Sequence, residues 1–261
     1  MTGLGGKAAV VGIGATEFSK DSGRSELQLS AEATLAALAD AGLSPADVDG
    51  LTTFTMDNSS EIALARELGM GDLRFFSRIN YGGGAACATV QQAAMAVATG
   101  VADVVVAYRG FNERSGQRFG QVQNWAATQV NTNGLDNAWT YPHGLSTPAA
   151  TVALQARRYM HETGATSADF GRVAVADRRH AATNPAAFFY GRPITLEEHQ
   201  ASRMIADPLR LLDCCQESDG AVALVITSLE RAADLAQRPA VIAAAAQGSA
   251  TNQFVMTSYY R

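Results

Sequence analysis

Three consecutive glycines, Gly82, Gly83 and Gly84, begin an almost entirely apolar segment that runs to residue 99 and is followed closely by the hydrophobic residues 102–107. The first segment is rich in alanine and has no polar face, so it is too apolar for a surface helix. The second is short and rich in valine, which is typical of a strand buried on both faces. The pattern predicts a helix and a strand at the centre of a layered core.

The rest of the N-terminal region alternates between strand and helix patterns. Such alternation implies parallel crossover connections and a sheet that helices cover on both faces. Ser60 is expected to cap the second helix, and Gly42 and Gly69 mark helix ends. The expected strands are residues 7–14, 50–55 and 102–108, and the expected helices are residues 27–41, 61–69 and 84–99.

The composition limits the compartment and the kinds of partner. The chain has 261 residues, of which 47% are hydrophobic and 17% charged, so it can bury a substantial core. A net charge of -5 gives no basic field for nucleic acid or for anionic membranes. No apolar run is long enough to span a bilayer, and no signal segment is evident. We therefore expect a cytoplasmic protein without a nucleic-acid or membrane partner.

The cysteines are Cys87, Cys214 and Cys215. This odd set has neither the spacing of a disulfide framework nor that of a metal site. The sequence predicts reduced, buried thiols, with Cys214 and Cys215 packed in the core, and no metal.

Residues 110–200 differ in composition from the sequence before them. They are aromatic, polar and interrupted by prolines, and a helix is predicted over residues 148–163. A segment of this length outside the alternating pattern is expected to form a lid or cap, where specificity usually resides.

Strand patterns return after this excursion. Residues 208–215 and 220–228 read as strands, and the turn residues Ser218, Asp219 and Gly220 between them predict a hairpin. Residues 241–246 have the pattern of one more core strand.

The glycines Gly12 and Gly14 after the first strand invite a dinucleotide-binding interpretation. The fingerprint requires a third glycine at residue 17, where this chain has Glu17, and no acidic residue ends the second strand as expected. A nicotinamide or flavin cofactor is therefore not expected.

Three stretches together resemble the sterol-carrier-type thiolases and their non-thiolase relatives: residues 8–14, residues 83–107, and residues 205–221 with their Leu-Leu-Asp-Cys-Cys and Ser-Asp-Gly-Ala motifs. The resemblance spans the first 250 residues or so. It implies a thiolase-like α/β fold with αβαβα layers, built from two similar halves. Residues 1–230 would form the first half, including the lid or loop excursion at about 110–200. Residues 239–261 would begin the second half, so a fragment of a longer protein is favoured over an unusual short member.

The resemblance places the family's acyl-accepting cysteine on Gly83, within one residue, and both neighbours are also glycine. Cys87 falls about one turn further along the helix. Acyl transfer through a cysteine requires an exposed thiolate at the helix N-terminus, where the helix dipole lowers the thiol pKa. The chain offers no such cysteine, so a covalent acyl-enzyme is not expected.

The glycine run could still serve as an oxyanion site. Bare backbone N–H groups at a helix N-terminus can approach a ligand oxygen and stabilise an enolate. In this respect the chain is similar to the actinobacterial steroid side-chain aldolases. The implied function is a carbon–carbon lyase that cleaves a β-hydroxy acyl-CoA of a sterol or bile-acid side chain by retro-aldol chemistry, giving a ketone and a shortened acyl-CoA. A thiolase-type acyltransferase and a non-catalytic acyl-CoA or lipid carrier, or scaffold subunit, remain alternatives.

Seven residues are candidates for the site. Tyr81, Gly83 and His143 are the catalytic candidates, and Gly82, Gly84, Tyr141 and Tyr190 are the substrate-binding candidates. The glycines could instead serve only a tight turn, Tyr81 could serve packing, and His143 could be an ordinary loop histidine. The second half of the family fold could also supply the base.

Other polar residues are given mainly structural interpretations. His161, His180 and His199 are expected at the surface, and the Ser218 to Gly220 turn is expected to be structural. Two basic pairs, Arg157 with Arg158 and Arg178 with Arg179, could meet the phosphates of coenzyme A, although paired arginines on a helix are usually only solvated.

The resemblance also implies partners. Coenzyme A would enter as part of the substrate, and no other cofactor is expected. A small DUF35-type OB-fold protein, encoded separately or fused to a hydratase, would complete the assembly. We expect a homodimer paired through the strand at residues 102–108, and a heterotetramer with the partner.

Overall fold

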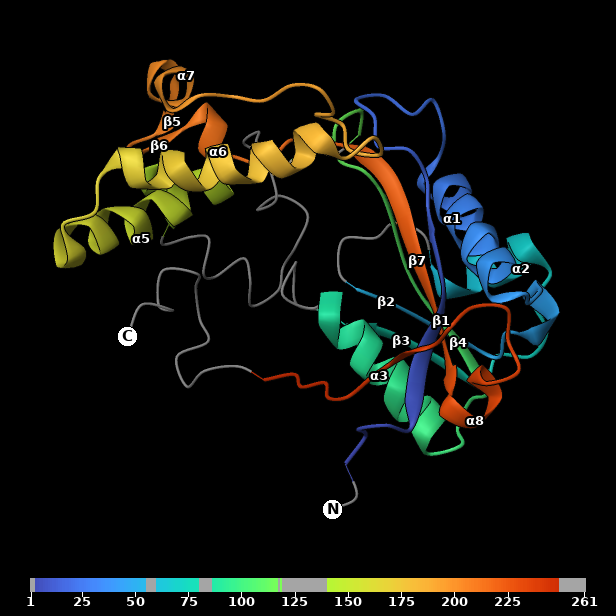
Figure 1. The fold of residues 1–261 in the computed structure, drawn as a ribbon. Coiled ribbons are helices and arrows are strands. Elements are labelled where there is room, and N and C mark those ends of the chain that lie inside the picture. Colours follow the sequence, from blue (N-terminus) through green and yellow to red (C-terminus); the bar gives the residue numbers. More distant parts are fainter. Residues whose placement is uncertain (1–2, 55–59, 80–85, 117, 119–139, 249–261) are drawn as a thin grey trace. The chain divides into compact units, whose positions relative to one another are not determined.

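The computed structural model describes residues 3–54, 60–79, 86–116, 118 and 140–248. The chain divides into two compact units, each described here by itself (Figure 1). The first unit comprises Met1–Ser115 and Ser218–Gly248, and the second comprises Gly116–Glu217 and Ser249–Arg261.

The first unit is built on a six-stranded mixed sheet with the strand order β3-β2-β4-β7-β1-β8. Strands β2, β3 and β4 are parallel to one another, as the alternating pattern predicts. Strand β7 runs antiparallel to its neighbours β4 and β1. The strands are β1 (Ala8–Ala15), β2 (Gly50–Phe54), β3 (Phe75–Ile79), β4 (Val104–Asn112), β7 (Asp219–Ser228) and β8 (Ala240–Val241).

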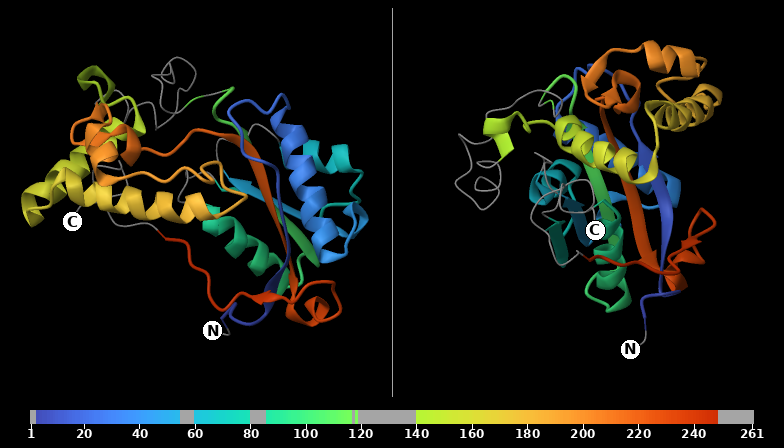
Figure 2. Two further views of the ribbon diagram at one scale, coloured as in Figure 1. Left: turned by 45° about the horizontal axis from the view of Figure 1, so that its top comes forward. Right: turned by 90° about the vertical axis from the view of Figure 1, so that its left-hand side faces the viewer.

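Helices cover both faces of this sheet (Figures 1 and 2). Helices α1 (Glu26–Ala41) and α2 (Glu61–Leu68) lie on one face, and α3 (Ala86–Ala98) lies on the other. A short 3-10 turn, Pro45–Asp47, precedes β2, and the short helix α8 (Leu229–Ala232) follows β7.

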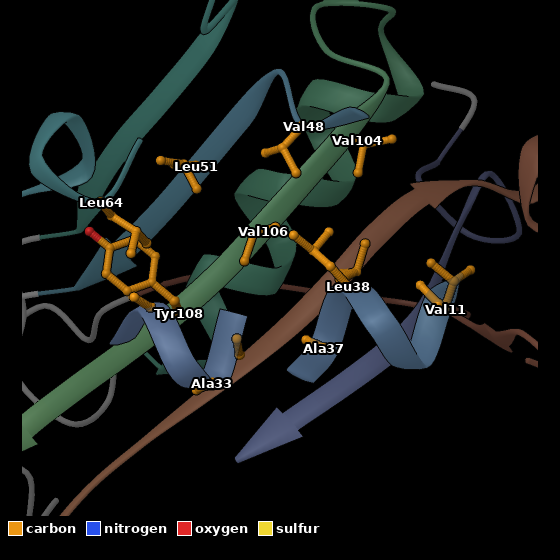
Figure 3. Close-up of a cluster of buried hydrophobic side chains, with 14 of the residues drawn as sticks. Val11, Ala33, Ala37, Leu38, Val48, Leu51, Leu64, Val104, Val106 and Tyr108 are labelled. Atoms are coloured by element: carbon orange, nitrogen blue, oxygen red, sulfur yellow. The ribbon is translucent and has the colours of Figure 1, made fainter. Parts of the chain in front are cut away.

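Alternate residues of β4 enter two different cores. Val104, Val106 and Tyr108 pack in the cluster that contains residues of α1 (Figure 3). Val105 and Ala107 pack in the cluster that contains residues of α3. Residues 104–107 of the predicted central strand are therefore buried on both faces, and because all four are apolar, both cores can be apolar.

The helix ends follow the caps that the sequence suggests. The side chain of Ser60 accepts a hydrogen bond from the backbone N–H of Ala63 at the start of α2. Gly42 and Gly69 end α1 and α2 with φ angles of 73° and 64°, the left-handed region that glycine adopts without strain.

Gly12 and Gly14 allow α1 to lie directly on β1. A Cβ atom at Gly12 would lie 2.2 Å from the carbonyl oxygen of Ala37, and one at Gly14 would lie 2.2 Å from that of Ala33. These glycines therefore serve packing of helix on strand, which agrees with rejecting a dinucleotide site.

The second unit consists of short helices and a small hairpin. Helix α5 has the predicted bounds, Pro148–Thr163, whereas the longer helix α6, Ser167–Thr183, was not predicted. The remaining elements are a 3-10 turn at Tyr141–His143, helix α7 (Leu196–Ala201), strands β5 (Met204–Ala206) and β6 (Leu209–Arg210), and a 3-10 turn at Leu211–Asp213.

Several predicted strands require correction. The hairpin of residues 208–215 with 220–228 is wrong, because β6 pairs with β5 and β7 pairs with β1 and β4. Residues 241–246 contribute only Val241 to a two-residue edge strand, β8, whose two side chains are exposed. Strand β3 was missed.

The predicted dimer strand is also wrong. Strand β4 lies inside the sheet, because β2 pairs with one side of it and β7 with the other. Its backbone groups are used by these neighbours, so it cannot pair with a second copy.

Candidate active site

The glycine run joins the carboxyl end of β3 to α3. Tyr81, Gly82, Gly83 and Gly84 lie outside the described residues, between Ile79 at the end of β3 and Ala86 at the start of α3. In open sheets with parallel strands, ligands bind outside the carboxyl ends of the strands. Ile79, the residue of β3 that precedes the run most closely among the described ones, lies at the edge where a site is expected.

An apolar cluster and a cation mark the same edge. Phe54, the last residue of β2, packs against Ile79 and Ala88. The guanidinium of Arg109 on β4 lies 4.1 Å from the centre of the Phe54 ring and 5.1 Å from that of Phe111. Cation–π contacts of this kind hold a positive charge over an apolar surface.

Cys87 lies on α3, as expected, and its side chain is exposed. The prediction that all three thiols are buried is therefore wrong for this residue. That glycines occupy the family's nucleophile position stays a prediction, because these residues lie outside the described part of the chain.

The loop after β4 is fastened by the carboxylate of Asp219. Its Oδ1 accepts hydrogen bonds from the backbone N–H groups of Arg114 and Ser115, at 2.9 and 3.0 Å. Its Oδ2 accepts from the hydroxyl of Ser115 at 2.5 Å and from the backbone N–H of Ser22 at 3.1 Å. Burial alone would raise the pKa of Asp219, but these hydrogen bonds hold it below its ordinary value.

The structural interpretation of Asp219 is supported, but its form was wrong. The residue begins β7 and does not sit in a hairpin turn. It binds backbone groups far away in the sequence and not those of its own turn. Gly220 is required for another reason, since a Cβ there would lie 2.6 Å from the ring of Phe18.

The second unit contains the other predicted site residues. Tyr141 and His143 share one 3-10 turn that ends at Gly144, whose φ is 81°, and His143 is exposed. Tyr190 is exposed in the segment after α6, where its backbone N–H binds the carbonyl of Ala187. The structure brings Tyr141 and His143 together and places Tyr190 in a different segment.

The burial of His199 was not predicted from the sequence. This residue was expected at the surface, as were His161 and His180, which are indeed exposed. Its side chain is fully buried, and its Nε2 lies 2.7 Å from Oδ1 of Asp213. The one signal in the sequence is Gly171 within α6, because a Cβ at that position would lie 2.7 Å from Nδ1 of His199.

A groove of about 630 Å³ is lined by residues of α5 and α6 and by residues that follow them, including Leu209 and residues 212–216, which are called its base here. The apolar lining residues are Val152, Ala156, Tyr159, Phe170, Val173, Ala174, Ala181, Phe189, Ile194, Leu209 and Leu212.

Cys214 and Cys215 line this groove and are not packed in the core as predicted. Cys215 is exposed and Cys214 is half-buried. Burial, together with the neighbouring Asp213 and Cys215, raises the pKa of the Cys214 thiol.

The basic pairs find local partners. Arg157 pairs with Asp207, and Arg158 pairs with Glu162. Arg178 lies 3.6 Å from the centre of the Phe189 ring, and burial and Arg192 lower its pKa. Contact with coenzyme A phosphates stays a prediction.

Across the part of the chain that the structure describes, no three His, Cys, Asp or Glu side chains gather as a metal site would require. Within the same residues, no helix is both long enough and apolar enough to cross a membrane.

Comparison with known proteins gives a consistent result. The family described as thiolase, N-terminal domain, matches residues 8–230. The chain is 72% identical, over 258 residues, to the 17-hydroxy-3-oxo-4-pregnene-20-carboxyl-CoA lyase of Mycobacterium tuberculosis, covering 99% of this chain and 67% of that protein. It is 67% identical, over 261 residues, to the steroid side-chain-cleaving aldolase of Thermomonospora curvata, again covering 67% of the relative.

Solved structures agree. The structure described as Ltp2-ChsH2(DUF35) aldolase superposes with a TM-score of 0.92 at 67% identity, covering 99% of this chain and 65% of that chain. An SCP2-thiolase-like protein of Mycobacterium smegmatis superposes with a TM-score of 0.65 at 22% identity, covering 87% of this chain and 47% of that one, which shows the shared fold. The chain thus spans about two thirds of the length of the relatives to which it is most similar here.

Proposed function

Because the chain belongs to the thiolase family and, within it, to the steroid side-chain-cleaving aldolases, we propose that it forms part of a carbon–carbon lyase acting on a steroid acyl-CoA. The observation that carries this proposal is identity of 72% and 67% to a lyase and an aldolase over nearly the whole chain. The glycine run in place of a nucleophilic cysteine is consistent with it.

The proposed reaction is a retro-aldol cleavage. A base removes the proton of the β-hydroxyl group, and the oxygen forms the carbonyl of a ketone as the bond between the α and β carbons breaks. The electron pair of that bond passes to the thioester as an enolate, which is then protonated to the shortened acyl-CoA. No acyl-enzyme forms at any step, so no thiol is required.

We assign roles to the candidate residues on this basis. The backbone N–H groups of Gly82, Gly83 and Gly84 would stabilise the enolate oxygen, at a helix N-terminus whose dipole favours negative charge. Tyr81 and His143 would transfer protons. Support for the glycines comes from their place in the sequence, after the carboxyl end of the parallel strand β3 and before α3.

Tyr141 and Tyr190 are proposed as substrate contacts. Coenzyme A would be bound as part of the substrate, with no separate cofactor. Free cysteines are consistent with a cytoplasmic location, because disulfides are rare in that compartment.

We propose a DUF35-type OB-fold protein as the partner, in line with the similar Ltp2-ChsH2(DUF35) structure. We also propose a homodimer, but through β3 and not through β4. Strand β3 is the outermost strand on its side of the sheet, and Phe76 in its middle is exposed. An edge strand of this kind can pair with a second copy.

The test uses the full-length protein together with its OB-fold partner. The mixture is incubated with a β-hydroxy steroid acyl-CoA, and separately with a β-ketoacyl-CoA plus free coenzyme A, and products are identified by mass spectrometry. A steroid ketone and a shortened acyl-CoA from the first substrate support the proposal. Thiolysis of the second with a transient acyl-protein adduct would reject it in favour of an acyltransferase, and silence in both would favour a carrier or scaffold.

A further inference from the structure

The groove between α5 and α6 leaves large apolar side chains in contact with solvent. Val152, Tyr159 and Val173 all line it, yet they are 36%, 43% and 61% exposed. Its volume of about 630 Å³ falls within the range of about 300–1,000 Å³ that small-molecule sites occupy. A concave apolar surface that is exposed in this way is a candidate binding site for an apolar ligand.

The charge at the base of the groove is already compensated. Oδ1 of Asp213 lies 2.7 Å from His199, and Oδ2 accepts a hydrogen bond from the backbone N–H of Arg210 at 2.7 Å. Both oxygens of the Asp213 carboxylate therefore have hydrogen-bond partners within the protein, and the carboxylate does not require a cation from a ligand. A second carboxylate, that of Asp177 on α6, also lines the groove and is exposed.

One cationic donor also lines the groove. Arg178 stacks on Phe189, and its Nη1 donates to the carbonyl of Arg192 at 3.3 Å. A guanidinium carries five N–H donors in a fixed plane, so further donors can serve a ligand oxygen. Stacking on the ring limits the motion of this side chain and lowers the entropy lost on binding.

We propose that this groove binds the fused rings of a steroid substrate and that Arg178 donates a hydrogen bond to a ketone oxygen on those rings. The inference rests on the proposed function, which supplies the steroid as the substrate class. A fused-ring ligand fits the apolar walls because it is rigid, so little conformational entropy opposes its binding.

The cysteines provide a direct test on the full-length protein. Cys215 is exposed in the groove, whereas Cys87 is exposed in the other unit and serves as an internal control. Alkylation by N-ethylmaleimide is followed at each thiol by peptide mass spectrometry, with and without saturating progesterone. We expect progesterone to slow alkylation of Cys215 about tenfold or more and to leave Cys87 unchanged. Equal rates at Cys215, or the same slowing at both thiols, would overturn the inference.

Two matched pairs of variants separate the walls from the donor. Val173→Trp should fill the groove and raise the Kd of progesterone about tenfold, whereas Leu154→Trp, exposed on α5 outside the groove, should leave it within about twofold. Arg178→Gln should weaken the binding of progesterone but not the binding of its 3-deoxy analogue. Arg179→Gln, at an exposed position that does not line the groove, should affect the binding of neither. Equal effects within either pair would contradict the assignment.

These outcomes are independent of the proposed reaction. Lyase activity without protection of Cys215 would keep the proposed function and reject the groove. Protection of Cys215 without lyase activity would keep the groove as a steroid site and reject the proposed function.

Discussion

Nε2 of His199 lies 2.7 Å from Oδ1 of Asp213, and the two side chains are 0% and 6% exposed. The pair joins α7 to the 3-10 turn that forms part of the base of the groove. Removing one member of this buried pair leaves a polar atom of the other without its hydrogen-bond partner, and this costs more than the intact hydrogen bond contributes.

His199→Leu should therefore lower the free energy of unfolding by about 1–3 kcal/mol. His180→Leu, at an exposed position, should change it by less than about 0.5 kcal/mol. Urea denaturation measures both. If the double variant His199→Leu with Asp213→Leu is as unstable as the sum of the single variants, the two residues do not act as a pair.

The carboxylate of Asp219 should make stability depend on pH in the acid range. Its pKa in the folded protein lies below its ordinary value of 3.8, so its contribution is fully present above that value. The contribution is lost as the pH falls below 3.8 through the lower pKa of the folded state. Asp219→Asn should remove this part of the acid transition and cost about 1.5–3 kcal/mol at neutral pH.

Ser115→Ala tests the cause of that shift, because it deletes the hydroxyl that binds Asp219. It should raise the pKa of Asp219 toward its ordinary value, measured by NMR titration of the carboxyl carbon. An unchanged titration would show that the backbone donors alone set the pKa.

Gly12→Ala should destabilise the first unit, because the new Cβ would lie 2.2 Å from the carbonyl oxygen of Ala37. Helix α1 would have to move away from β1, at a cost of about 1–3 kcal/mol or more. Gly71→Ala is the matched control, because nothing lies within 4 Å of a Cβ there and its φ is not left-handed. Thermal unfolding that ranks the two variants equally would exclude the packing role.

Cys87→Ser should keep the lyase activity within about twofold, because retro-aldol cleavage requires no thiolate. Gly83→Val should lower kcat/KM by about 100-fold or more, because its side chain would keep the enolate oxygen from the backbone N–H groups. Circular dichroism confirms that both variants fold. The reverse order of effects would identify Cys87 as a nucleophile.

The thiols of the groove should differ in their response to pH. The pKa of Cys214 is raised, so a smaller fraction of it is thiolate at neutral pH than for an ordinary cysteine. At about pH 7, alkylation of Cys214 should be slower than that of the exposed Cys215. The ratio of the Cys214 rate to the Cys215 rate should rise from about pH 7 to about pH 10. A ratio of the two rates that stays constant over this range would contradict the raised pKa of Cys214.

The sequence predicted elements whose signals are local. Helix α5 has a proline at its start and a glycine at its end, and its bounds were found. Strand β3 was missed because it is short and lacks the apolar run of a central strand. Its exposed residues Phe76 and Arg78 alternate with less exposed ones. The hairpin at Asp219 was wrong because its hydrogen-bond partners lie about a hundred residues or more away.

Burial that depends on distant residues could not be predicted in the same way. His199 resembles a surface histidine until Gly171 makes room for its ring and Asp213 pairs with it. The groove is assembled from α5, α6 and residues 209–216, none of which carries a binding motif of its own. The apolar helix after the glycine run was predicted from a local pattern, whereas the role of the run itself stays a prediction.

The position of β7 has a consequence for how the chain is made. Strands β1 and β4 are both complete by Asn112, yet the strand that lies between them begins only at Asp219. At a synthesis rate of about 5–20 residues per second, roughly 5–20 s separate the two events on the ribosome. During that interval β1 and β4 both lack β7, the strand that later lies between them and pairs with each. Each of the two strands therefore presents an open edge. The nascent protein is thus most prone to aggregate while its second unit is being synthesised, and the arrival of β7 ends that period.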